Sequence, residues 1–555
     1  MNNKVKIALA VIILIATVLR FYKLDRVPFG FHADEAAMGY NAYSIIKTGK
    51  DEYGTKLPIL FLRSFNDWKA AGYVYFTIPS VLVFGLNEFS SRFPTAFFGV
   101  LTVPLLFFVA KKLTGSNKIS LLSAFLLALS PWHNNLSRIM SEPIVAAFFV
   151  LFGLYAFLAA KEKKSLMWLF LSFILWLISF YIYHSSRIFV PLFVISLMFI
   201  FRNSLIPAIK KFSFLFLIVL IFIPLFLTTF FAPGVSRFKA VSIFDHPYVR
   251  LILEEQIRED GNQNTLITRF FHNKVINYSR EAVKNYTQHF TFDFFFLNGG
   301  LPLRENIPAS GIMYVIEAPF LFAGVYYLLK KRNKNTYIIL SWILISPISP
   351  AITFEDIPNV HRFIIAAPML ELIAAIGFFS LSLSLKQSLT RKVIIVVSLI
   401  GLSYGLSYYL HQYYVHQQVH RPWYRFSGYR EMVNYVSKNK KNYDRVLITK
   451  AHAPSHIFFL FYEKYDPILY QQAGSPGDSH LKGFDKYIFI NEDCPANLSK
   501  EAKKDIKTLF IERGECEIPG YVKELKIIRR EDDTPAFKIV EIDFLKAKEI
   551  LKYEN

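Results

Sequence analysis

The chain has 555 residues, of which 53% are hydrophobic and 17% aromatic, and it carries a formal net charge of +21. Its mean hydropathy is +0.32, and its apolar residues come in long runs that a soluble protein of this length does not need. A high positive charge can indicate nucleic-acid binding, but here short basic tracts separate the hydrophobic runs. The composition therefore indicates a polytopic membrane protein that is mainly α-helical.

The basic tracts define the predicted topology. They contain almost only Lys and Arg, with Glu162 as the one acid, which is typical of cytoplasmic loops. About eleven spans alternate between them, each near the ~17–25 residues that a membrane helix needs. The predicted spans are 5–22, 92–110, 119–132, 143–160, 165–182, 187–201, 212–231, 311–329, 336–352, 362–384 and 391–410.

The hydrophobic stretch 72–86 is left out of this set. It is short and contains Pro79, and counting it as a span would move every later basic tract to the outside. We predict an interfacial helix there, within a long outer loop over residues 23–91. A second long outer loop is predicted over residues 232–310, and the protein is expected in the plasma membrane with its N-terminus in the cytoplasm.

The tail from about residue 411 has a different composition. Short β-like runs (445–449 and 486–490) alternate with helical patterns (428–438 and 500–507). The sequence therefore predicts a membrane domain over residues 1–410 and a small extracytoplasmic α/β domain over residues 411–555. The two cysteines, Cys494 and Cys516, both lie in that domain, and the sequence leaves open whether they form a disulfide or stay free thiols.

Charged and aromatic residues gather beside the outer ends of the predicted spans. An adjacent acid pair, Asp34-Glu35, follows the first span, whereas a second pair, Asp51-Glu52, is predicted to be solvated. Several cations and one acid pair at one membrane face suit an anionic head group with a reaction beside it. The further candidates are Lys69, Arg138, Glu142, Tyr183, His184, Arg304, His361 and Arg362. Membrane anchoring is the alternative for Lys69 and the arginines, and an interfacial aromatic belt for Tyr183 and His184.

Other chemistries lack their motifs in this sequence. It contains no Gly-rich phosphate loop, no Cys/His cluster or His-Glu-x-x-His for zinc, and no serine nucleophile elbow. The cytoplasmic loops have almost no acids that could hold the metal of a nucleotide-sugar enzyme.

Three stretches resemble the GT-C membrane glycosyltransferases of family 39, the relatives of protein O-mannosyltransferases and of the lipid A aminoarabinose transferase. The first is the outer loop with Asp34-Glu35, Lys69 before a helix, and the run 85–94 (GLNEFSSRFP). The second is Ser-Pro-Trp-His at 130–133 followed by Arg138 and Glu142, and the third is Asn-Val-His-Arg-Phe at 359–363. The resemblance covers about residues 1–410. It implies that Asp34 is the catalytic base with Glu35 in support, and that Lys69 and Arg138 bind a lipid phosphate.

The implied activity is inverting transfer of a sugar from a polyprenyl-phosphate donor to an acceptor at the outer face. The scheme requires no cofactor, although Asp34, Glu35 and His32 could hold a divalent metal. The acceptor stays open between protein, glycan and lipid, and the sugar and oligomeric state stay open too. The main alternative is a transporter or flippase of a lipid-linked glycan, which would need ionisable residues at mid-membrane and repeated halves. A scaffold with a partner-binding tail gives no reason for the acid pair.

Overall fold

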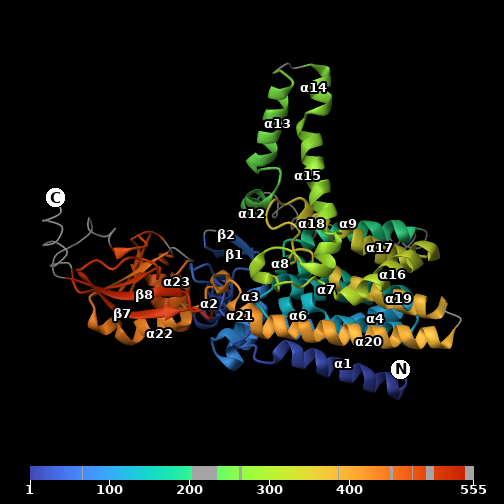
Figure 1. The fold of residues 1–555 in the computed structure, drawn as a ribbon, viewed down its shortest axis with the longest axis horizontal. Coiled ribbons are helices and arrows are strands. Elements are labelled where there is room, and N and C mark those ends of the chain that lie inside the picture. The colour runs from blue at the N-terminus through green and yellow to red at the C-terminus, as the bar shows by residue number, and fades with distance from the viewer. Residues whose placement is uncertain are drawn as a thin grey trace. The chain divides into compact units, whose positions relative to one another are not determined.

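The computed structural model describes residues 1–65, 67–202, 234–261, 265–384, 387–450, 454–477, 479, 481–495 and 506–543. The chain divides into two compact units. Unit 1 comprises residues 1–22, 67–72 and 95–412, and unit 2 comprises residues 23–66, 73–94 and 413–555. Each unit is built from three separate stretches of sequence, so the chain passes between the units more than once (Figure 1).

Unit 1 is a bundle of helices. Its first half contains α1 (Asn3–Phe21), the greater part of α4 (Glu88–Thr114), α5 (Asn117–Leu129), α6 (Pro131–Ser137), α7 (Glu142–Lys163), α8 (Leu166–Ile182) and α9 (Ser186–Ile200). Its second half contains α12 (Gly234–Val241), α13 (Pro247–Glu259), α14 (Leu266–Phe271), α15 (Lys274–Gln288), α16 (Ala318–Lys331), α17 (Lys334–Ile345), α18 (Ile348–Ala351), α19 (Ala367–Ser384) and α20 (Ser388–His411). Short turns η1 (Asp293–Leu297), η2 (Leu303–Glu305), η3 (Val315–Glu317) and η4 (Ile364–Ala366) connect them, and η5 (Gln412–His416) follows α20. Strand β2 (Asp67–Ala70) also belongs to this unit.

The predicted spans correspond to helices wherever the structure describes them, while the span predicted at 212–231 lies outside the described residues. Among the described helices, four are long and apolar enough to cross a membrane: Glu88–Thr114, Glu142–Lys163, Ile364–Ser382 and Ser388–Val419. Shorter apolar helices occupy Gly72–Phe84, Asn117–Leu129, Leu166–Ile182 and Ser186–Ile200. The helical architecture is therefore confirmed, and the number of spans stays a prediction.

Glycines allow two helices of the bundle to pack closely. A Cβ atom at Gly377 of α19 would collide with the carbonyl oxygen of Phe320 on α16, and one at Gly324 would collide with that of Ile373. Small residues at a helix crossing let the two backbones approach, which is the usual way that helices associate within lipid. The close contact between α16 and α19 is therefore possible because Gly324 and Gly377 have no side chain.

A buried arginine joins α1 to the rest of the bundle. Arg20 is fully buried and donates to the carbonyl oxygens of Leu127 and Ala128 at the end of α5, at 3.2 Å each. It also lies 2.8 Å from Nδ1 of His133. Because buried cations need partners, these contacts fix the C-terminal end of α1 against α5 and α6.

Unit 2 contains a mixed sheet with helices. The helices are α2 (Ala33–Thr48), α3 (Gly72–Phe84), α21 (Gln417–Val419), α22 (Tyr429–Asn439), α23 (His456–Tyr462) and α24 (Pro467–Gln472), with turns η6 (Pro422–Arg425) and η7 (Lys440–Asn442). The strands are β1 (Phe61–Ser64), β3 (Arg445–Thr449), β4 (Gly483–Phe484), β5 (Tyr487–Ile490), β6 (Thr508–Glu512), β7 (Val522–Arg529) and β8 (Pro535–Ile542). Strands β3 to β8 form one sheet in the order β4-β5-β3-β6-β8-β7.

The centre of this sheet is parallel and its margins are antiparallel. Strand β3 pairs in parallel with β5 and β6, with Leu447 opposite Ile488 and Phe510. All five residues of β6 are buried, as expected for a central strand covered on both faces. The predicted α/β tail is confirmed here: the run 445–449 is β3, 486–490 contains β5, and 428–438 covers α22 except for its last residue. The helix predicted at 500–507 lies mostly outside the described residues.

The first outer loop folds together with the tail. Phe31 lies 4.8 Å from Phe461 of α23 between ring centroids, and the Tyr40 hydroxyl donates to the carbonyl oxygen of Tyr465. The prediction that Asp51 and Glu52 are solvated is wrong, since both side chains are buried. The physical reason is the tail itself: Gln471 and Ser475 donate to the backbone carbonyl oxygens of this pair, which draws the segment into the interior of unit 2.

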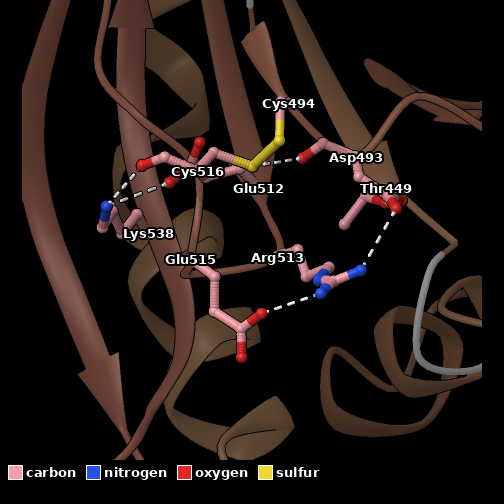
Figure 2. Close-up of a disulfide and its surroundings, with 8 residues drawn as sticks. All are labelled: Thr449, Asp493, Cys494, Glu512, Arg513, Glu515, Cys516 and Lys538. Atoms are coloured by element: carbon pink, nitrogen blue, oxygen red, sulfur yellow. Dashed lines mark hydrogen bonds and ion pairs between the residues drawn. A yellow bond between two sulfur atoms is a disulfide. The ribbon is translucent and has the colours of Figure 1, made fainter.

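The two cysteines form a disulfide. Cys494 and Cys516 are joined across a separation of 22 residues, beside the end of β6 (Figure 2). Lys538 of β8 donates to the carbonyl oxygen of Cys516 at 2.7 Å, which ties the disulfide loop to the sheet. The alternative that the sequence left open is thereby resolved in favour of the bridge.

Candidate active site

The acid pair occupies the first turn of α2. His32 is the N-cap: its Nδ1 accepts from the Asp34 N–H at 3.2 Å, while Glu35 Oε2 accepts from the His32 N–H at 3.0 Å. These reciprocal bonds satisfy backbone donors that a helix start leaves open, and the helix dipole favours carboxylates there. At the other end Gly49 closes the helix with φ 69°, a conformation that glycine adopts without steric cost. The local sequence thus fixes both carboxylates at a helix N-terminus.

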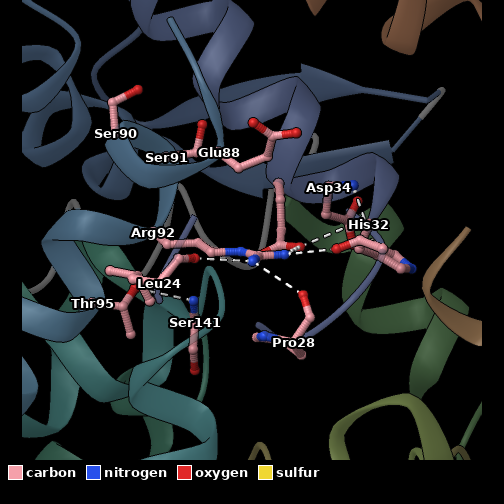
Figure 3. A network of polar contacts seen from close by, with 12 residues as sticks. Leu24, Pro28, His32, Asp34, Glu88, Ser90, Ser91, Arg92, Thr95 and Ser141 are labelled. Atoms are coloured by element: carbon pink, nitrogen blue, oxygen red, sulfur yellow. Dashed lines mark hydrogen bonds and ion pairs between the residues drawn. The ribbon is translucent and has the colours of Figure 1, made fainter. Parts of the chain in front are cut away.

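Glu35 is engaged in a buried ion pair with Arg92, from the first turns of α4. Nε of Arg92 lies 3.0 Å from Oε1 of Glu35, and Nη2 lies 3.2 Å from Oε2 (Figure 3). Burial alone would raise the pKa of Glu35, but the Arg92 charge and its hydrogen bonds outweigh burial, so the pKa is lowered. Glu35 is therefore held as a carboxylate whose two oxygens are already used.

Arg92 also organises the loop that precedes α2. Its remaining donors reach the carbonyl oxygens of Leu24, Pro28 and Gly30 at 3.2, 3.2 and 2.8 Å (Figure 3). The arginine is fully buried, so these bonds are shielded from water. Residue 92 stands in the motif at 85–94, but its function as the partner of Glu35 could not be read from the sequence.

Asp34 contrasts with its neighbour. Its side chain is 34% exposed, whereas that of Glu35 is 3% exposed. One carboxylate oxygen of Asp34 lies 3.5 Å from Nδ1 of His32. The structure thus separates the two acids physically: Glu35 is buried in a structural ion pair, and Asp34 is accessible to a substrate.

In unit 1, five of the predicted residues belong to one polar cluster, which we call the His361 cluster. His361 Nε2 lies 3.0 Å from the Ser141 hydroxyl, which directly precedes Glu142, and the His361 ring contacts that of Tyr183 at 5.7 Å between centroids. Glu305 lies 3.7 Å from Nδ1 of His361 and 3.5 Å from Nε of Arg304. The cluster consists of Ser141, Glu142, Tyr183, Arg304, Glu305, Asp356, His361 and Arg362.

The charged groups of this cluster act on one another. Burial raises the pKa of Tyr183 to about 12, with Arg362 opposing the shift and Glu142 adding to it. Burial also raises the pKa of Asp356, against the opposing charges of Arg304 and Arg362. Arg362 itself donates from Nη1 to the Thr353 hydroxyl at 2.8 Å and to the Glu355 carbonyl oxygen at 3.1 Å. Four segments that are distant in the sequence therefore meet here, as the topology predicted.

Three predicted residues have other surroundings. Arg138 is buried and donates to the carbonyl oxygens of Leu19 and Tyr22 at 2.7 and 2.6 Å, so that it caps the C-terminus of α1. Lys69 lies partly buried on β2, and His184 follows α8. The assigned roles of all three in substrate binding stay predictions. Sequence reasoning had also not selected Ser141 and Glu305, which stand beside chosen residues but carry no signal of their own.

The described residues fit a metal poorly. Over this part of the chain, no group of three or more His, Cys, Asp or Glu side chains could hold a metal ion. At the acid pair, Arg92 and the His32 N–H take the Glu35 oxygens, which leaves Asp34 and His32 as the remaining donors. A divalent metal between Asp34 and Glu35 would have to displace the ion pair.

Comparison with known proteins relates the chain to membrane glycosyltransferases. Residues 69–228 match the family model described as dolichyl-phosphate-mannose-protein mannosyltransferase. An uncharacterised protein of Aquifex aeolicus is 35% identical over 89 residues, which are 16% of this chain and 18% of that protein.

Solved structures resemble the chain over a greater length. ArnT from Cupriavidus metallidurans bound to undecaprenyl phosphate matches with a TM-score of 0.56 and 11% identity, over 96% of this chain and 97% of its own. The oligosaccharyltransferase AglB from Archaeoglobus fulgidus, in complex with an inhibitory peptide and a dolichol-phosphate, has a TM-score of 0.49 and 14% identity. That match covers 83% of this chain and 63% of AglB, so the chain spans less than two thirds of that protein.

The family match over residues 69–228 indicates a glycosyltransferase and agrees with the resemblance predicted from the sequence. The ArnT match shows that the two chains share a fold.

Proposed function

We propose that the chain is an integral-membrane inverting glycosyltransferase that moves a sugar from a polyprenyl-phosphate donor to an acceptor at the outer membrane face. The proposal rests above all on the different surroundings of the two acids, Asp34 and Glu35. Glu35 is buried in an ion pair with Arg92, whereas the Asp34 side chain is 34% exposed and therefore accessible to a substrate. Asp34 is also fixed at a helix N-terminus, in the part of the chain where the resemblance places the base. The family match and the ArnT fold support the donor class.

The proposed reaction transfers one proton and breaks one bond. The acceptor hydroxyl or amine attacks the anomeric carbon opposite the phosphate, and Asp34 takes its proton. The bond between the anomeric carbon and the phosphate oxygen breaks, and its electrons leave with the polyprenyl phosphate. A positioned base of this kind typically contributes ~10²–10⁴-fold to the rate. Glu35 then acts as a positioning residue, because it holds the helix start on which Asp34 lies.

The leaving phosphate gains charge, which calls for cations. We assign this stabilisation to Arg362, with Arg304, His361 and Lys69 as further candidates for binding the phosphate or the sugar. Arg362 is held by Thr353 and Glu355, so little rearrangement is needed to present its remaining donors. Arg138, which caps α1, is assigned a lesser part.

The orientation in the membrane is also part of the proposal. Basic tracts place the ends of the spans near Lys111, Lys161 and Lys330 in the cytoplasm. The disulfide Cys494–Cys516 supports an extracytoplasmic tail, because such bonds persist in oxidising compartments. We therefore expect a multi-pass plasma-membrane protein with a cytoplasmic N-terminus and an outer C-terminal domain.

The decisive experiment measures transfer by the purified, reconstituted protein. Radiolabelled polyprenyl-phosphate sugars and membrane extract are supplied as donor and acceptor, and transferred label is counted. We expect turnover by wild type and a loss of about 10²–10⁴-fold in Asp34→Asn. Asp25→Asn, an exposed residue of the same outer loop, is the matched control and should retain full activity.

Two outcomes would count against the proposal. If wild type turns over no donor of this class, the enzyme assignment fails and a transporter of lipid-linked glycans becomes the better explanation. If Asp34→Asn is as active as wild type, the base assignment fails while the reaction class stands.

A further inference from the structure

A helical hairpin projects from unit 1. Its arms are α13 and α15, and α14 lies at its tip; Figure 1 shows it extending sideways from the bundle, across the direction of α1 and α20. The base is fixed: Asn285 donates to the carbonyl oxygens of Ala351 and Thr353, and His289 Nε2 accepts from the Asn359 N–H at 2.9 Å. The hairpin is therefore built onto the loop that carries His361 and Arg362.

Polar groups of α15 contribute to the contact between the two arms, while α13 buries Val249 and Leu253. Asn277 of α15 is buried and donates to Gln256 Oε1 of α13 at 2.9 Å, and the Tyr278 hydroxyl donates to the Phe244 carbonyl oxygen at 3.0 Å. In a water-soluble hairpin the apolar faces of the helices would be turned toward each other. Here the buried positions of α15 are Asn277 and Asn285, which leaves its apolar side chains outside.

The apolar side chains gather at the tip and along α15. At α14, Leu266 is 86% exposed, Ile267 71% and Phe270 70%, and Phe271 beside them is exposed as well. On α15 the exposed apolar residues are Val275, Ile276 and Val283. Single exposed apolar residues are ordinary, but a contiguous set of this size marks a surface that something covers.

Charge differs between the two arms. From residue 265 to 290 the cations are Arg269, Lys274, Arg280 and Lys284, against Glu281 as the acid of that stretch, which pairs with Lys284 at 3.2 Å. The α13 arm carries an excess of acids instead, with Glu254, Glu255, Glu259 and the following Asp260 against Arg250 and Arg258. An amphipathic helix with apolar and basic groups is typical of elements that lie in the interface of an anionic bilayer.

The direction of the hairpin agrees with a position on the surface of a bilayer. In Figure 1, α15 and α14 lie on the side of the hairpin toward the N-terminal end of α1, and α13 lies on the opposite side. With that end in the cytoplasm, the side of the hairpin formed by α14 and α15 is turned toward the bilayer, and the side formed by α13 is turned away from it.

We propose that the α13–α15 hairpin is a membrane-surface anchor that lies on the outer leaflet, inserts Leu266, Ile267, Phe270 and Phe271 among the lipid chains, and binds anionic phospholipid head groups through Lys274, Arg280 and Lys284. The inference rests on the membrane orientation given under the proposed function, but not on the transfer chemistry. Such an anchor would also fix the depth of the His361 cluster relative to the membrane surface. The reason is that Asn285 and His289 hold the segment between Thr353 and Asn359, which lies beside that cluster.

The test measures the depth of the tip in the full-length protein. An environment-sensitive fluorophore is attached to Phe270→Cys, and to Glu255→Cys on α13 as the matched control, while the native cysteines stay in their disulfide. Protein is reconstituted in vesicles of phosphatidylcholine with phosphatidylglycerol. We expect the label at 270 to be quenched by lipids with a spin label near the head group and several-fold less by aqueous iodide than the label at 255.

A charge variant tests the lipid preference. Lys274→Glu/Arg280→Glu/Lys284→Glu should weaken quenching by spin-labelled lipid at 270, since each basic residue near an anionic surface is worth about fivefold in affinity. In pure phosphatidylcholine the variant should have little effect.

Two results would overturn the proposal. Equal iodide quenching at 270 and 255 would place the tip in water, and protection at 270 from both quenchers would show that protein covers it, such as a second copy. The quenching experiment is independent of the transfer assay. If the tip is inserted but no sugar is transferred, the proposed enzymatic function is refuted and the proposed anchor is supported.

Discussion

Removal of the Glu35 charge should destabilise unit 2 strongly. In Glu35→Gln, Arg92 keeps three carbonyl partners but loses the carboxylate that it pairs with, while it stays fully buried. Loss of one member of a buried ion pair typically costs ~3–5 kcal/mol, because the other charge is left uncompensated. For a domain of 150–250 residues, each kcal/mol corresponds to roughly 2–4 °C in Tm, so we expect a decrease of roughly 6–20 °C.

The assay is thermal unfolding of the purified protein, with Glu431→Gln as the matched control. Glu431 lies exposed on α22 and undergoes the same chemical change, so its Tm should move little. Asp34→Asn should leave Tm near that of wild type while it lowers transfer by about 10²–10⁴-fold. A Tm for Glu35→Gln within about 2 °C of wild type would refute the structural role given to the ion pair.

The same pair predicts a pH dependence. The pKa of Glu35 in the folded protein lies below its ordinary value of 4.5, so the ion pair stabilises fully above that value. This stabilisation is lost as the pH falls through the lowered pKa of the folded state. Below pH 4.5 the difference in Tm between wild type and Glu35→Gln should therefore shrink, and a constant difference down to strong acid would contradict the assignment.

Three other variants test separate features. Cys494→Ser/Cys516→Ser should destabilise unit 2 by about 3 kcal/mol, measured by thermal unfolding and mimicked in wild type by reductant. Gly377→Leu should sharply reduce the yield of folded protein because α16 and α19 could no longer approach, whereas Leu399→Phe at an exposed α20 position should not. Arg362→Gln should lower kcat/KM for the donor by about 10²–10³-fold with little change in Tm, and an unchanged kcat/KM would remove it from the site.

The fold was predictable where single segments decide it. Long apolar runs predicted the helices of unit 1, and the β-like runs 445–449 and 486–490 predicted two of the central strands. These signals are local, since length and period suffice to identify a helix or a strand. The gathering of Tyr183, Arg304, His361 and Arg362 followed from topology alone, because their loops lie at one face.

The sequence could not indicate partners that lie far apart in the chain. Glu35 and Arg92 are 57 positions apart, and neither segment contains a pattern that indicates the other as its partner. Arg138 donates to two carbonyl groups at the end of α1, and the sequence could not indicate these backbone partners. Its predicted role in phosphate binding stays a prediction. Asp51 and Glu52 looked solvated because the residues that cover them, Gln471 and Ser475, belong to the tail.

The discontinuity of unit 2 has a consequence for biosynthesis. Helix α2 is synthesised early, yet Phe31 and Tyr40 pack against α23 and the residues after it, which leave the ribosome only after every helix of unit 1. Contacts between such distant parts of a chain form late in folding. The acid pair would thus reach its final structure only in a chain that is finished and fully inserted. In a truncated or misinserted product, the helix that carries Asp34 would lack its packing partners in the tail. We therefore expect such products to be inactive.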